Sequence, residues 1–236
     1  MDDKIQYQTA RHDLYRFIVL GTFLGAFIAA AGISFCVWAK YQEIGQQVFN
    51  LRTDFLGDYV NAEYAFVYNI ALLITGLCIM LAMLGLYQLR HSTISHYLSF
   101  IGGWVGMMVL LAGAFPINYL DMHRTVSTLM LLGTVLMYLV SVIDRFSHNA
   151  ICKGPIFGFS ILGLYASISL CVQLDWNTLD FPPCSHADGD ICWMAVTLWL
   201  QTNCIMLWCL SLAWAVRAAS MKNNLALSKR YLVGAH

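Results

Sequence analysis

Charged side chains are scarce in this sequence. Asp, Glu, Lys and Arg together make up 11% of the 236 residues, whereas hydrophobic residues make up 59%. A soluble domain carries about 25% charged residues, because its surface must stay in contact with water. The composition, with a mean hydropathy of +0.65, therefore excludes an ordinary water-soluble globular domain.

Basic tracts and catalytic motifs are also missing. The 13 Lys and Arg balance 13 Asp and Glu, and no stretch is basic enough to follow a phosphate backbone. We therefore expect no nucleic-acid partner. The sequence has no Gly-x-Ser-x-Gly motif and no Ser/His pair inside an apolar stretch, so a serine hydrolase is not supported.

Six long stretches contain no Asp, Glu, Lys, Arg or His. Even the shortest, 19 residues, crosses roughly 30 Å of hydrocarbon at about 1.5 Å per residue. We predict an all-α polytopic membrane protein, a bundle of six transmembrane helices that forms one integral membrane domain over residues 1–236. The predicted spans are 17–38, 65–87, 97–115, 125–143, 155–174 and 191–216.

The distribution of Lys and Arg predicts the orientation of these spans. Ten of the 13 fall on the side that holds both termini, and only Lys40, Arg52 and Arg124 fall on the other. Because cytoplasmic loops carry the excess of positive charge, we expect an N-in/C-in protein of the plasma (bacterial inner) membrane. Cys184 and Cys192 then share a loop on the oxidising outer side and form a candidate disulfide.

The first outer connection, 39–64, is too long for a simple turn. Its apolar residues recur at spacings of three and four, which predicts an amphipathic helix. Such a helix either lies in the membrane interface or packs over the end of the bundle, and both alternatives place Asp54 and Asp58 near the outer face. The apolar residues are Tyr41, Ile44, Val48, Leu51 and Phe55.

The hinge between the third and fourth spans gathers the densest polar cluster, including Asp121, His123 and Arg124. His123 could bind a metal, transfer a proton, or hold an anionic head group together with Arg124. Alternatively, Asn118 caps the fourth helix with Asp121 in its first turn, and His123 is an ordinary interfacial residue.

Cofactor sites find little support in the sequence. Every His lies at or beyond the end of a span, so no haem or metal is predicted, and a bound lipid is the one small molecule left open. The spans carry too few polar residues, among them Asn69 and Gln201, for an ion-coupled carrier. A pocket for an apolar molecule stays compatible with them.

Several short motifs resemble those of a known family. They are Asp54-Phe-Leu-Gly57, Ala65-Phe-Val-Tyr-Asn69, Gly85-Leu-Tyr87, and Gly113-Ala-Phe-Pro116 with His123 downstream. Over roughly residues 17 to 216 the chain resembles the six-helix membrane family of domain of unknown function 998, which is distantly similar to damage-regulated autophagy modulator-like membrane proteins. The chain departs from the family pattern around Thr53 and Asp58. The resemblance implies a six-helix fold with a polar outer-face site near His123, and it implies no reaction.

Besides a passive carrier, which would need a continuous polar path past Asn69 and Asn203, two functions remain open. The first is a non-enzymatic integral membrane protein that binds a lipid or serves as an accessory or assembly subunit, with membrane lipids and other membrane subunits as partners. The second is an intramembrane enzyme that acts on a lipid or isoprenoid head group at the outer face. The catalytic candidates are His123, Asp121, Asp54 and Asp58, and the ligand-binding candidates are Arg124, His123 and Asn69.

Overall fold

Six helices in the computed structural model correspond to the six predicted spans, which confirms the fold class. All six are long and apolar enough to cross a membrane. The structure describes residues 2–89, 91–182, 184 and 191–233, with side chains for 12–89, 91–182, 184 and 191–221. The helices are α1 (Asp2–Ile44), α2 (Ala65–Leu89), α3 (Thr93–Ala114), α4 (Leu120–Asp144), α5 (Pro155–Gln173) and α6 (Trp193–Val233).

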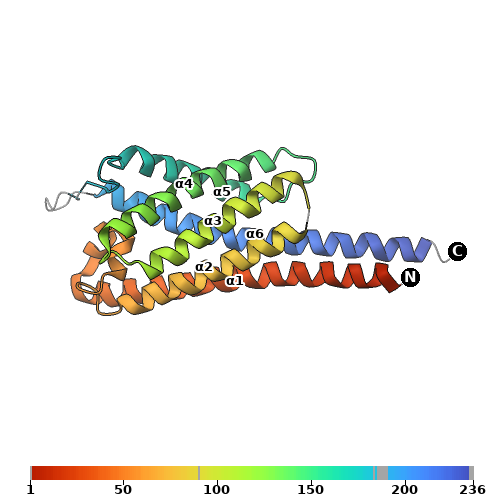
Figure 1. Ribbon diagram of the computed structural model, residues 1–236, viewed down its shortest axis with the longest axis horizontal. Helices are drawn as coiled ribbons and strands as arrows, with labels where there is room; N and C mark the ends of the chain where they lie inside the picture. The colour runs from red at the N-terminus through yellow and green to blue at the C-terminus, as the bar shows by residue number, and fades with distance from the viewer. Residues whose placement is uncertain (1, 90, 183, 185–190, 234–236) are drawn as a thin grey trace.

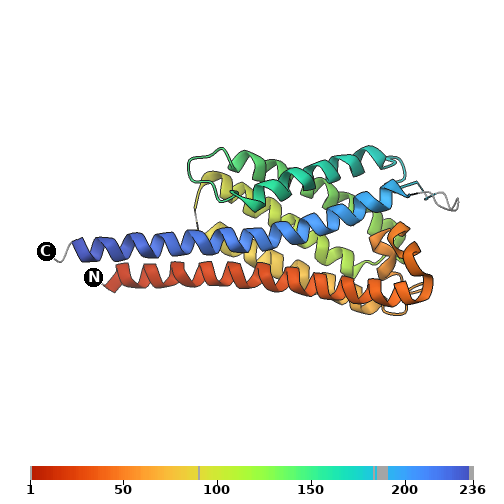
Figure 2. The same cartoon turned by 180° about the vertical axis from the view of Figure 1, so that it is seen from behind.

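The helices are arranged as a closed ring. Each one packs against the next in the chain, and α6 returns to pack against α1 (Figures 1 and 2). Both chain ends lie at one end of the ring, where α1 and α6 extend beyond the other four helices. We call the opposite end the cap end; it consists of η1 (Gly45–Asn50), η2 (Thr53–Gly57) and the described residues of loops 58–64, 115–119 and 174–192.

The connection 39–64 differs from its prediction. It is not one amphipathic helix, because α1 continues to Ile44 and ends where Gly45 adopts a φ of +63°. Two short 3-10 helices follow, and they place Val48 in the core while Phe55 stays exposed. The segment packs over the end of the bundle, since η1 contacts α1 and α6.

Glycines allow α2 and α3 to approach closely. A Cβ atom on Gly76 would lie 2.6 Å from the carbonyl oxygen of Gly106, well inside van der Waals contact. A side chain at Gly76 would therefore push the two backbones apart. A Cβ atom on Gly158 of α5 would have no neighbouring atom within 4 Å, so a methyl group there would meet open space.

The interior of the ring is filled on the side of the termini. Large side chains there are at most 1% exposed, and all six helices contribute, with Ile18 from α1 and Ile156 from α5. Toward the cap end the interior holds a cavity of about 150 Å³. The filling side chains include Met83, Leu98, Tyr138, Trp208 and Leu212.

Candidate functional site

Ion pairs join three distant segments above this cavity. Arg52, just before η2, donates to Asp54 through Nε and Nη2, at 3.1 Å and 2.6 Å. Its Nη1 donates to Asp180 of the α5–α6 loop at 2.6 Å. Arg124 of α4 also donates to Asp180, through Nε at 3.0 Å and Nη2 at 2.5 Å. We call Arg52, Asp54, His123, Arg124 and Asp180 the cap cluster.

The two carboxylates of the cap cluster are held in their ionised forms. Burial on its own would raise the pKa of Asp54, but the close His123 ring and the charge and hydrogen bonds of Arg52 outweigh it and lower that pKa. Burial opposes ionisation at Asp180 as well, and hydrogen bonds from Arg52 and Arg124 lower its pKa. Both shifts follow from opposite charges in close contact.

His123 is placed by a backbone carbonyl. Its Nδ1 lies 2.9 Å from the oxygen of Phe115, which can only accept, so Nδ1 carries a hydrogen. Its Nε2 lies 3.4 Å from Oδ2 of Asp54, which is longer than an ordinary hydrogen bond. The side chain is only 7% exposed, and Nε2 has no hydrogen bond of normal geometry. This nitrogen is therefore the group of the cap cluster left to bind a ligand.

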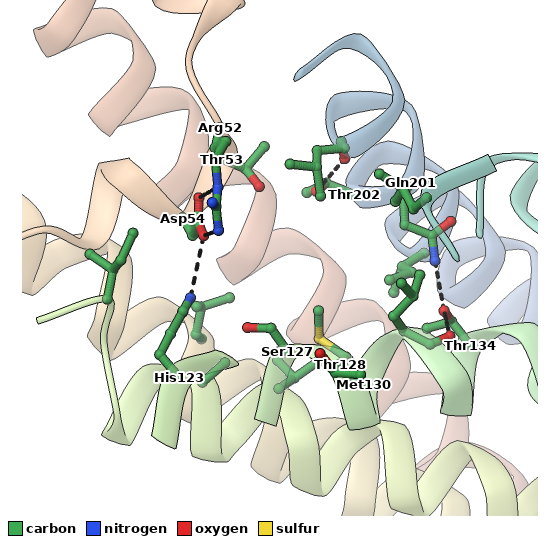
Figure 3. A pocket seen from close by; sticks show the side chains of 18 of the residues that line it. Arg52, Thr53, Asp54, His123, Ser127, Thr128, Met130, Thr134, Gln201 and Thr202 are labelled. Carbon is green, nitrogen blue, oxygen red and sulfur yellow. Dashed lines mark hydrogen bonds and ion pairs between the residues drawn. The ribbon is translucent and has the colours of Figure 1, made fainter. Parts of the chain in front are cut away.

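The cavity begins at the cap cluster and continues between the helices. His123 and Asp54 lie at one side of it, and Gln201 and Thr134 lie at the other (Figure 3). All six helices contribute to its wall. Between the two polar sides the wall is mainly apolar and includes Ile33, Leu72, Val109, Met130, Leu131 and Ile205.

A second polar group lies at the far side of the cavity. Nε2 of Gln201 donates to Oγ1 of Thr134 at 2.8 Å, and that hydroxyl donates to the carbonyl of Leu131 at 2.8 Å. The Gln201 side chain is buried, and its Oε1 has no hydrogen-bond partner among the residues that the structure describes.

The predicted site residues divide into two groups. Asp54, His123 and Arg124 come together in the cap cluster, and Asn69 lines the cavity while its Nδ2 donates to the carbonyl of Gly57 at 3.0 Å. Asp121 is exposed and does not line the cavity.

Asp58 also lies outside the cavity, where it orders a turn of the cap end. Its carboxylate accepts from the backbone of Val60 at 2.9 Å and from the side chains of Asn61 at 2.6 Å and Asn118 at 2.8 Å. Asn118 therefore does not cap α4: the residue at that position is Tyr119, which makes no side-chain cap. The capping prediction for Asn118 is wrong because its amide binds Asp58 instead.

Arg52 and Asp180 were missing from the sequence-based candidates. A signal for them exists, because the α5–α6 connection contains four Asp and no Lys or Arg. Arg52 and Arg124 are two of the three cations expected on the same side of the membrane, and both pair with Asp180. A comparison of all acidic and basic residues expected on one side of the membrane would have suggested that these arginines pair with Asp180.

Cys184 and Cys192 of this loop lie at disulfide distance, with Cα atoms 5.6 Å apart, as predicted. Within the described part of the chain, no three His, Cys, Asp or Glu side chains gather in a way that could hold a metal ion.

Six apolar helices in a closed ring, with an ion-paired cap over an internal cavity, define a polytopic helical membrane protein. The model of the family described as "Protein of unknown function (DUF998)" matches residues 17–215, so the chain belongs to that family. No curated protein and no solved structure matches the chain.

Proposed function

We propose that this protein binds one lipid-like amphiphile, with the polar head at the cap cluster and the apolar chain in the cavity, and that it does so without chemical turnover. One observation supports this most directly: a single cavity has charged residues such as Arg52 and His123 at one side and Leu72, Val109 and Met130 along its wall. Ligand pockets combine an apolar lining with a few placed polar groups in the same way.

The charges of the cap cluster favour an uncharged head group. The guanidinium groups of Arg52 and Arg124 are already paired with the carboxylates of Asp54 and Asp180. A phosphate would have to displace one of these carboxylates, whereas a hydroxyl group can donate to Nε2 of His123 without breaking an ion pair.

The expected orientation of the protein determines which leaflet of the membrane the ligand's head group would face. The excess of Lys and Arg on the side of the termini supports a cytoplasmic location for both ends in the plasma membrane. The cap end then faces outward, and the head group of the ligand lies at the outer leaflet. The cavity favours ligand binding over a purely structural role as an accessory subunit, which would need no internal space.

Filling the cavity tests the proposal. Val109 is buried and lines the cavity, whereas Val172 on α5 is 81% exposed. We expect Val109→Trp to abolish co-purification of a bound lipid and Val172→Trp to leave it unchanged, because only the first indole occupies the binding space. Native mass spectrometry of protein released from nanodiscs measures the bound lipid per chain. Equal lipid in both variants, or none in the wild type, contradicts the proposal.

An enzyme acting on a lipid or isoprenoid head group is the second candidate, because His123 presents Nε2 beside the carboxylate of Asp54. A histidine so placed can move a proton to or from a bound hydroxyl or ester. Incubation of the purified protein with membrane lipids should then yield a product that His123→Asn does not form, although this variant still binds lipid. No product from the wild type eliminates this candidate.

A further inference from the structure

The far side of the cavity carries a hydrogen-bond acceptor that the protein does not use. Gln201 is 5% exposed, lines the cavity, and leaves Oε1 without a partner among the described residues. An unpaired carbonyl in an apolar setting is unfavourable, and buried polar groups in folded proteins are nearly always paired.

The neighbouring hydroxyl fixes which amide atom is unpaired. Oγ1 of Thr134 gives its hydrogen to the carbonyl of Leu131, so toward Gln201 it can only accept. The Gln201 NH2 group must therefore face Thr134, and the carbonyl oxygen must be the free atom. A partner for this oxygen has to be a donor.

The acceptor lies deep in the bundle. Thr134 is 11 residues beyond His123 on α4, which corresponds to about 16 Å along a helix axis. The hydrocarbon core of a bilayer is roughly 30 Å thick, so Gln201 lies near its middle when His123 lies near its edge. No free lipid head group resides at that depth.

We infer that the ligand of this cavity carries a second polar group, a hydroxyl about 16 Å from its head, that donates a hydrogen bond to Oε1 of Gln201. This inference rests on the proposed function and narrows it to one class of amphiphile, a chain with polar groups at both ends. Within this class the head hydroxyl approaches Nε2 of His123, and the distal hydroxyl satisfies Gln201.

Paired probes and paired variants test the inference. The probes are a straight-chain alcohol and the α,ω-diol of the same length, both long enough to extend from His123 to Gln201, offered together at equal concentration in nanodiscs. Native mass spectrometry gives the ratio of bound diol to bound alcohol. The variants are Gln201→Met, which removes the carbonyl with little change of shape, and Asn203→Leu, which removes an exposed amide on the same helix.

We expect Gln201→Met to lower the diol-to-alcohol ratio about five- to tenfold, as loss of one buried hydrogen bond implies, and Asn203→Leu to leave it unchanged. Partition of the probes into lipid cancels, because it is the same for all three proteins. An equal ratio in wild type and Gln201→Met overturns the inference and means that water satisfies the carbonyl. If the wild type binds neither probe, the proposed function fails as well.

A ligand-side control needs no variant and covers the case in which Gln201→Met does not fold. Methylating the distal hydroxyl of the diol to an ether keeps the chain but removes its donor. The wild type should bind the diol at least fivefold better than this ether after correction for partition into nanodiscs that lack protein. Equal binding of the two overturns the inference.

Discussion

Asp180 is the residue on which the cap cluster depends most. It accepts from Arg52 and Arg124, so it links η2, α4 and the α5–α6 loop through one carboxylate that is 20% exposed. No other carboxylate of the cap cluster binds both guanidinium groups. The segments of the cap cluster are therefore joined by a residue that does not belong to any helix.

Asp180→Asn should destabilise the protein by about 1–2 kcal/mol, because both guanidinium groups lose a charged acceptor in a partly buried site. The unfolding midpoint in nanodiscs measures this effect. Asp175→Asn is the matched control, since the Asp175 carboxylate is exposed in the same loop and accepts only from Asn177 and Thr178 of its own turn. Equal loss in both variants would show that the cap cluster adds no stability.

The same carboxylates predict a pH dependence. The pKa values of Asp54 and Asp180 are lowered in the folded protein, where burial opposes but hydrogen bonds and ion pairs outweigh it. Their stabilisation is complete above the unfolded value of about 3.9 and is lost as the pH falls through the lower folded values. The stability difference between wild type and Asp180→Asn should therefore shrink below about pH 4. A difference that stays constant down to about pH 3 contradicts the assignment.

At the scale of the elements, the helices were predictable because a membrane constrains the backbone that crosses it. A backbone in lipid must satisfy its own hydrogen bonds, so an uncharged stretch of sufficient length becomes a helix whatever its neighbours are. The cap end has no such constraint. Its form depends on Gly45, which ends α1, and on contacts such as that between Arg52 and Asp180, which are 128 residues apart.

The cavity was harder to predict than the helices around it. His123 and Gln201 were each noticed in the sequence, but nothing in their local patterns shows that both line one space. That relation exists because α6 closes the ring against α1, and such a contact leaves no periodic signal in either helix. The ligand-binding candidates Arg124, His123 and Asn69 do line the cavity, whereas Asp58 and Asp121 do not.

The close contact of α2 and α3 gives a prediction at this scale. Gly76→Ala should destabilise the protein by about 1–3 kcal/mol, since its Cβ would meet the backbone of α3 and force a shift. Gly158→Ala should be neutral or slightly stabilising, because the same methyl group meets nothing and alanine favours the helix. Thermal unfolding of both variants in one lipid composition measures the contrast, and equal midpoints would refute it.

For the whole molecule, an even number of spans requires both ends to lie on one side of the membrane. Reporter fusions at residue 1 and residue 236 should both report the cytoplasm, in line with the distribution of Lys and Arg. A thiol reagent that cannot cross the membrane should label the 184/192 pair from outside only after reduction. If the two reporters lay on opposite sides of the membrane, the prediction that the cap end faces outward would be wrong.

Ring closure also determines when the cavity comes into existence during synthesis. The helix that completes the wall, α6, is made after the other five, and it docks beside α1. Until then the cavity has no wall on the side where Gln201, Thr202 and Ile205 of α6 line it. The site that we propose for a lipid is therefore complete only once the last of the six helices has been made.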